Sequence, residues 1–202
     1  KDKTNCPILI NTSFNVRGEP IVNTVFDAFN CFMGTNLDKL VIGNCYLDKK
    51  NQLLHKVAEW KSGGAPKQVA FTPNGEELWV TQLVGNGVEI FDPNTGELQG
   101  FVDLPDGGSV EIIFNREGTL AYVSQMETAS VYEIDVFKRE IIRNLDTEGY
   151  WSKVMVLSPD ETTLWVSNWS SNDVSEIDLS TGEVIERMRS VIKPRGLWVT
   201  PD

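Results

Sequence analysis

A short polar loop near the start of the chain carries residue types that bind phosphate. In the stretch Asn11–Val22, Ser13 and Asn15 offer short hydrogen-bonding groups, Arg17 offers a guanidinium fork, and Gly18 lets the backbone approach an anion closely. In the alternative interpretation, Ser13 and Asn15 close an Asx-type turn and Arg17 is a solvated surface charge. The residues alone support both interpretations equally.

A second set of polar residues recurs through the rest of the chain. Side-chain amides stand 43 residues apart, and basic residues follow a repeated Pro or Ser, with Val110 breaking the basic series. The amides are Gln82, Gln125 and Asn168, and the basic residues are Lys67, Lys153 and Arg195. They predict a polar, partly basic rim that holds a small anionic ligand, and Tyr150, Trp151 and Trp169 are the aromatic candidates for a contact surface. The alternative, which the residue types favour, is that the amides satisfy backbone groups at strand ends and the basic side chains are solvated.

The composition argues against a metal site and against catalytic residues. Three cysteines, 25 and 14 residues apart, form no CxxC pair, and the single histidine is His55. We therefore expect neither a metal site nor catalytic residues. The net charge of −11 disfavours nucleic acid as a partner, and apolar runs such as Leu40–Ile42 are too short for a membrane span.

The elements that carry these residues follow a repeat. Trp79, Tyr122 and Trp165 share one register with a period of 43 residues, and we expect them in equivalent buried positions. Each repeat alternates short apolar strands with turns rich in Pro, Asp and Gly. Four antiparallel strands per period are typical of a β-propeller blade. We expect blades at about 63–106, 107–149 and 150–192, with partial blades at both ends.

The chain is composite. Residues 1–50 hold every cysteine and no tryptophan, whereas residues 53–202 hold every tryptophan and most of the negative charge. In the first part an apolar strand and the polar loop precede a helix that starts after Thr24, with Phe26, Phe29, Phe32 and Met33 as its apolar stripe. The predicted fold is mainly β: a partial propeller arc of three to four blades, preceded by a small α/β fragment.

The repeat resembles the YVTN family of propellers. Segments such as Val69–Gly75 (VAFTPNG) followed by Leu78–Thr81 (LWVT) carry the likeness, which extends over residues 63–202. It implies a scaffold that binds a protein or a small molecule at the propeller face, in the periplasm or at the cell surface. A lactonase-like enzyme whose active site lies in other blades is the alternative. Open blade edges favour self-association.

The N-terminal part resembles the C-terminal end of the O-carbamoyltransferases. The likeness runs from about Cys6 to Lys50 and rests on NTSFNVRGEPIV and LVIGNCYLDKK. It implies a cytoplasmic parent that transfers a carbamoyl group to a hydroxyl and uses ATP and carbamoyl phosphate. Ser13 and Asn15 match the Ser-x-Asn pair of YrdC-like domains, and Arg17 is expected to add a phosphate contact.

That resemblance also limits what this chain can do. The basic partners and the transferase domain, with its metal ligands, are expected upstream of this segment in the family. We therefore expect the chain alone to be inactive and to hold no cofactor. A natural fusion and a rearranged gene both explain the join at residues 48–53, where no Gly, Ser or Pro linker occurs.

Overall fold

The computed structural model describes residues 25–35, 37–42, 45–48 and 59–200, and it divides the chain into two units, Lys1–Ala58 and Glu59–Asp202. The fold is mainly β, as the sequence predicts, with a single helix among the described residues. The predicted phosphate loop, with Ser13, Asn15, Arg17 and Gly18, lies outside them.

The first unit contains helix α1 (Val25–Gly34) and an antiparallel pair of strands, β1 (Lys39–Ile42) and β2 (Cys45–Asp48). The helix begins at Val25, directly after Thr24, as the sequence predicts. The predicted apolar stripe is partly wrong.

The buried ridge of α1 consists of Ala28, Cys31 and Phe32, whereas Phe29 and Met33 are exposed. Positions 28, 31 and 32 are three and four residues apart and so share one helix face. Phe29 and Met33 lie on the neighbouring face. Of the predicted stripe, Phe32 is therefore correct, Phe29 and Met33 are wrong, and the side chain of Phe26 lies outside the described ones.

The second unit consists of three four-stranded antiparallel sheets, each in simple chain order. Blade 1 contains β3 (Pro66–Phe71), β4 (Leu78–Gln82), β5 (Gly87–Phe91) and β6 (Leu98–Asp103). Blade 2 contains β7 (Ser109–Phe114), β8 (Leu120–Gln125), β9 (Ser130–Asp135) and β10 (Glu140–Asp146). Blade 3 contains β11 (Ser152–Leu157), β12 (Thr163–Asn168), β13 (Asp173–Asp178) and β14 (Val184–Arg189).

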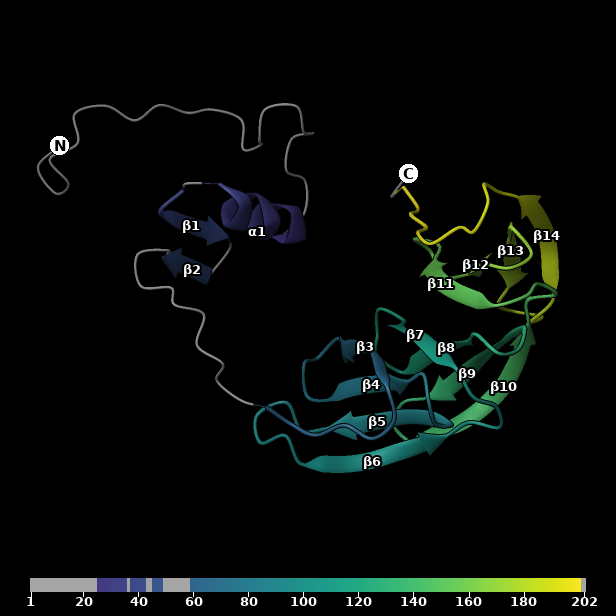
Figure 1. Cartoon of the computed structure of the whole chain (residues 1–202), viewed down its shortest axis with the longest axis horizontal. Coiled ribbons are helices and arrows are strands. Elements are labelled where there is room, and N and C mark those ends of the chain that lie inside the picture. The colour runs from purple at the N-terminus through teal and green to yellow at the C-terminus, as the bar shows by residue number, and fades with distance from the viewer. Residues whose placement is uncertain (1–24, 36, 43–44, 49–58, 201–202) are drawn as a thin grey trace, which may run out of the picture. The chain divides into compact units, whose positions relative to one another are not determined.

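The three blades form an arc, the partial propeller that the repeat predicts. Strands β3, β7 and β11 lie on its inner side, and β6, β10 and β14 lie on its outer side (Figure 1). Each first strand also contacts the first strand of the next blade. Blades therefore stack face to face.

Each first strand carries an irregularity at the same place. The pairing register shifts between Pro66 and Val69 in β3, between Ser109 and Ile112 in β7, and between Ser152 and Met155 in β11. Extra residues at a bulge bend a strand and re-aim its side chains. The predicted basic positions, Lys67 and Lys153, lie inside these irregular segments.

A buried hydroxyl on the second strand of each blade fixes this irregularity. Thr81 Oγ1 accepts a hydrogen bond from the backbone N–H of Gln68 at 3.0 Å and donates to the carbonyl of Val110, in the next blade, at 3.0 Å. Ser124 repeats the arrangement with the N–H of Glu111 at 3.2 Å and the carbonyl of Lys153 at 2.7 Å. One hydroxyl thus ties a blade to itself and to its neighbour.

Apolar side chains fill the interfaces between blades. Trp79 is fully buried between blades 1 and 2, and its ring meets that of Phe114 edge to face, with the centroids 5.5 Å apart. Tyr122 holds the equivalent place between blades 2 and 3 and is 2% exposed.

The expectation that Trp165 is buried like Trp79 and Tyr122 is wrong, since its side chain is only half-buried. Blade 3 has no fourth sheet against this face in the described part of the chain. A groove there is lined by Trp165, Val156 and residues 197–200. Those C-terminal residues have the sequence of a first strand, but they form no strand here.

We expect Trp79→Ala to lower the free energy of unfolding by about 3 to 5 kcal/mol, because it leaves a cavity in a sealed interface. Trp165→Ala, the matched control from the same register, should cost roughly 1 to 2 kcal/mol because its side chain is only partly removed from water. Urea unfolding of the full chain measures both. Equal losses would mean that the face of blade 3 is covered as fully as the other interfaces.

Candidate functional site

The predicted amides lie inside the blades. Gln82, Gln125 and Asn168 are 2%, 0% and 0% exposed. Gln125 exchanges hydrogen bonds with the Ser109 hydroxyl at 3.0 and 3.1 Å, while the Asn168 amide donates to Ser175 Oγ at 2.7 Å. These side chains connect the end of each second strand to neighbouring polar groups.

Two of the three predicted basic residues, in contrast, come together around one aromatic ring. The Lys153 ammonium lies 4.5 Å from the centroid of the Trp169 ring, and the Arg195 guanidinium lies 5.6 Å from it. Lys193, which the predicted series does not include, lies 4.4 Å away. We call Trp151, Lys153, Trp169, Lys193 and Arg195 the Trp169 cluster. Favourable contact between a cation and an indole face contributes about 0.5 to 1 kcal/mol at exposed sites.

The positive charges in the Trp169 cluster are not neutralised within the described residues. None of its three basic side chains forms an ion pair with a described carboxylate. Desolvation, followed by the like charges of Arg195 and Lys67, lowers the pKa of Lys153. Lys67 is therefore close enough to add to the positive potential, and the cluster is an electropositive site on a strongly acidic protein.

The backbone holds the cluster in an unusual conformation. Trp151 and Lys193 both adopt left-handed φ angles, of 60° and 58°, although neither is glycine. Trp151 stacks on Trp169 with centroids 5.1 Å apart and planes at 5°. The Trp169 backbone N–H also donates to the Trp151 carbonyl at 3.0 Å. Backbone strain of this kind is found most often at functional sites.

One donor in the cluster lacks an acceptor. The indole Nε1 of Trp169 is buried and has no hydrogen-bond partner among the described residues. Buried polar atoms are nearly always bonded, so such an atom needs an explanation.

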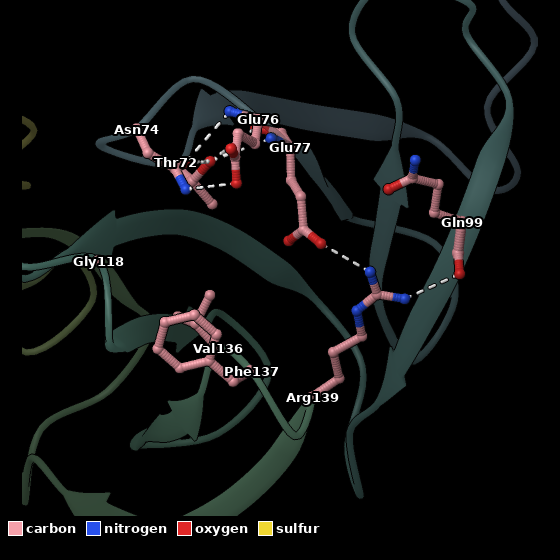
Figure 2. Close-up of a pocket in the computed structure, with 9 residues that line it drawn as sticks. All are labelled: Thr72, Asn74, Glu76, Glu77, Gln99, Gly118, Val136, Phe137 and Arg139. Carbon is pink, nitrogen blue, oxygen red and sulfur yellow. Dashed lines mark hydrogen bonds and ion pairs between the residues drawn. The ribbon is translucent and has the colours of Figure 1, made fainter.

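A separate pocket lies at the opposite edge of the arc, where blades 1 and 2 meet (Figure 2). It encloses about 460 Å³. Arg139 reaches across it, donating to the Glu77 carboxylate at 2.6 Å and to the Gln99 carbonyl at 2.8 Å, as Figure 2 shows. Trp79 Nε1 also donates to Glu77, at 2.8 Å. Arg139 and Glu77 neutralise each other, so this pocket joins two blades and offers a ligand little net charge.

Glu111 is a half-buried acid that connects two blades. Its carboxylate accepts a hydrogen bond from the backbone N–H of Met155 in blade 3, just as the Gln68 amide oxygen accepts one from Ile112 in blade 2. Burial raises the pKa of Glu111 from about 4.5 to about 7, and the Met155 N–H only partly opposes this shift. The residue that follows each position of the basic series, Gln68 in blade 1 and Glu111 in blade 2, therefore links its blade to the next.

Two kinds of feature are absent from the described residues. These residues contain no group of His, Cys, Asp and Glu that could hold a metal ion. They also contain no helix that is long and apolar enough to span a membrane.

Known proteins resemble the two parts of the chain separately. Residues 1–49 match the family model described as the carbamoyltransferase C-terminus. Nodulation protein NolO of Bradyrhizobium diazoefficiens is 50% identical over 50 residues, which cover 25% of this chain and 9% of NolO.

Over a longer stretch, antigen Lp49 of Leptospira interrogans is 30% identical across 161 residues, which cover 77% of this chain and 35% of Lp49. A chain of Kuenenia stuttgartiensis hydrazine synthase shares the fold, with a TM-score of 0.60 and 23% identity over 70% of this chain and 41% of that one. The chain thus spans less than half the length of each relative. Its N-terminal quarter is carbamoyltransferase-like, and the remainder has the fold of a partial propeller.

We expect Glu111→Gln to remove a pH dependence of stability. Between about pH 4.5 and 7 the unfolded chain releases the Glu111 proton while the folded chain keeps it, so the free energy of unfolding of the natural chain falls as pH rises. The glutamine variant should therefore be the more stable protein at pH 8, and the two should converge below pH 4.5.

Urea unfolding across this pH range measures the effect. Gln68→Glu, at the equivalent position, is the reciprocal control and should introduce a similar loss at high pH. Parallel pH profiles for the natural chain and Glu111→Gln would contradict this role of the Glu111 carboxyl.

Proposed function

We propose that the propeller segment is a binding scaffold whose ligand, a small molecule or a protein, carries negative charge and docks at the Trp169 cluster. The observation that carries this proposal is the convergence of Lys153, Lys193 and Arg195 on one tryptophan without a described carboxylate. Holding like charges together raises the free energy of the unbound protein, and an anion would relieve this.

The place of the cluster in the fold supports a binding role. Propellers carry their binding groups on loops at the ends of the strands. Trp169 directly follows β12, and Trp151 directly precedes β11, so both project from one edge of a rigid sheet. A binding scaffold of the YVTN type remains our proposal for this segment.

For residues 1–49 we propose descent from a carbamoyltransferase that uses ATP and carbamoyl phosphate. The family match and the identity to NolO support this. Ser13, Asn15, Arg17 and Gly18 are the proposed contacts to nucleotide or carbamoyl phosphate. The chain alone is proposed to be inactive, because about 50 residues are too few to form an independent core.

Arg17→Ala tests the role of the N-terminal loop. In a complete carbamoyltransferase that carries this segment, we expect the substitution to weaken carbamoyl phosphate or nucleotide binding by about 1.5 to 3 kcal/mol, the range for a hydrogen bond to a charged group. Lys3→Ala, a basic residue outside the loop, is the control. Equal affinities for Arg17→Ala and the unaltered enzyme would reduce Arg17 to a surface charge.

Cation-exchange chromatography tests whether the Trp169 cluster is an accessible site for anions. A protein of net charge −11 should flow through a sulfonate resin at pH 7 and low ionic strength, unless a local positive site is accessible. We expect the full chain to be retarded and Lys153→Ala/Arg195→Ala to flow through. Retention by itself would not identify the ligand.

The matched control is Lys138→Ala/Arg116→Ala, which removes two exposed positive charges from turns at the opposite edge. It should be retarded like the natural chain. Flow-through of the natural chain, or equal retention of both double variants, would refute anion binding at the Trp169 cluster.

A further inference from the structure

We propose that the Trp169 cluster recognises a phosphate-type dianion carried by a small molecule. This inference rests on the proposed function, anion binding at the Trp169 cluster, and adds the chemical class of the ligand. Its basis is the charge, donor geometry and rigidity of the cluster, together with the acidic surface around it.

The charge of the cluster matches a dianion better than a monoanion. Three basic groups lie within 6 Å of the centroid of a single indole ring, and Lys67 adds its potential at Lys153. A carboxylate with one charge would leave most of this repulsion in place. A phosphate group near neutral pH carries between one and two negative charges and several acceptor oxygens.

The donors also suit a tetrahedral oxyanion. Lys153 and Lys193 supply compact ammonium groups with rotatable donors, and Arg195 supplies a planar fork that binds two oxygens of one phosphate. The stacked Trp151 ring covers one face of Trp169. Recognition at Trp169 therefore depends on the charge and hydrogen bonds of the basic side chains around it.

The backbone keeps these donors in place. The N–H of Lys193 donates to Asn172 Oδ1 at 2.9 Å, and the carbonyl of Lys153 accepts the Ser124 hydroxyl at 2.7 Å. Pro194, between Lys193 and Arg195, is buried. A site held in its binding conformation before the ligand arrives loses less entropy on binding.

The surrounding charge selects a small ligand over a nucleic acid. Residues 51–202 contain 24 acidic and 12 basic residues. An extended polyanion would place its other phosphates over this acidic surface and be repelled. A single phosphate group can reach the cluster without that penalty.

Isothermal titration of the full chain with inorganic phosphate at pH 7.5 and fixed ionic strength tests the proposal. We expect saturable phosphate binding and no comparable binding of acetate at the same concentration. Lys153→Ala and Arg195→Lys should each weaken phosphate binding by about tenfold, since each removes charge-assisted hydrogen bonds. Lys138→Ala, at the opposite edge, should stay within about twofold of the natural chain.

Phenyl phosphate and a short single-stranded DNA are the other two arms. Binding of phenyl phosphate at least as tight as that of phosphate, with the same dependence on Lys153 and Arg195, would support a small phosphate ester. Preference for the DNA over both would overturn the small-molecule assignment.

Two results separate this inference from the proposed function. Suppose that the chain is retarded on the sulfonate resin but binds phosphate no better than acetate. The Trp169 cluster then remains an anion-binding site, and the assignment to phosphate is refuted. A chain that is not retarded refutes anion binding at the cluster itself. Phosphate binding that is unchanged in Lys153→Ala and Arg195→Lys would place the phosphate elsewhere and overturn the inference.

Discussion

The arc depends on one hydroxyl in each blade, placed near the end of the second strand. Thr81, Ser124 and Ser167 are fully buried, and each accepts the backbone N–H of its own first strand. The first two also donate to a carbonyl of the next blade. A hydroxyl can accept and donate at once, so a single small side chain keeps the irregular part of the first strand hydrogen-bonded while it joins two sheets. An alanine there would leave a buried N–H and a buried carbonyl without partners.

This constraint also places the candidate site. The irregular segment held by Ser167 is the one that carries Lys153, and the strand that carries Ser167 ends at Asn168, directly before Trp169. Lys153 and Trp169 therefore lie on neighbouring stretches of backbone that the Ser167 hydroxyl holds together. Arg195 and Lys193 approach from the segment that follows β14. The site thus combines a fixed strand edge with a later stretch of chain.

The sequence predicts much of this fold because the repeat is strict. A period of 43 residues without insertion identifies the strands, their order and the paired faces, so Trp79 and Tyr122 are correctly expected in the interfaces. The same reasoning fails for Trp165, because burial depends on a neighbouring blade and not on the residue itself. It also misjudges α1, where the small side chains of Ala28 and Cys31 face inward and Phe29 does not.

The candidate site is predicted only in part, for a similar reason. The sequence identifies Lys67, Lys153 and Arg195 as a series and Trp169 as an aromatic candidate for a contact surface, but it gives no sign of Lys193 or that the basic side chains gather around Trp169. Trp169 lies outside the repeated positions, and the left-handed backbone at Trp151 and Lys193 follows from tertiary structure. A useful signal was present in the sequence: Trp151 and Trp169 flank the first two strands of blade 3, and their spacing equals the length of a hairpin.

The three repeats of the hydroxyl series are not equivalent, and this has a consequence for cooperativity. Gln68 and Glu111 each add a side-chain acceptor for a backbone N–H of the following blade, whereas Val154, the third member, has none to offer. In repeat structures, stability is a sum of terms within each unit and between nearest neighbours. Blade 2 has such neighbours on both sides, so its amide hydrogens should exchange with solvent last. Among the described residues, blades 1 and 3 each have such a neighbour on one side only, so opening of the arc should start in one of these two blades. The Trp169 cluster lies in blade 3, and a ligand bound there would stabilise an outer blade against opening.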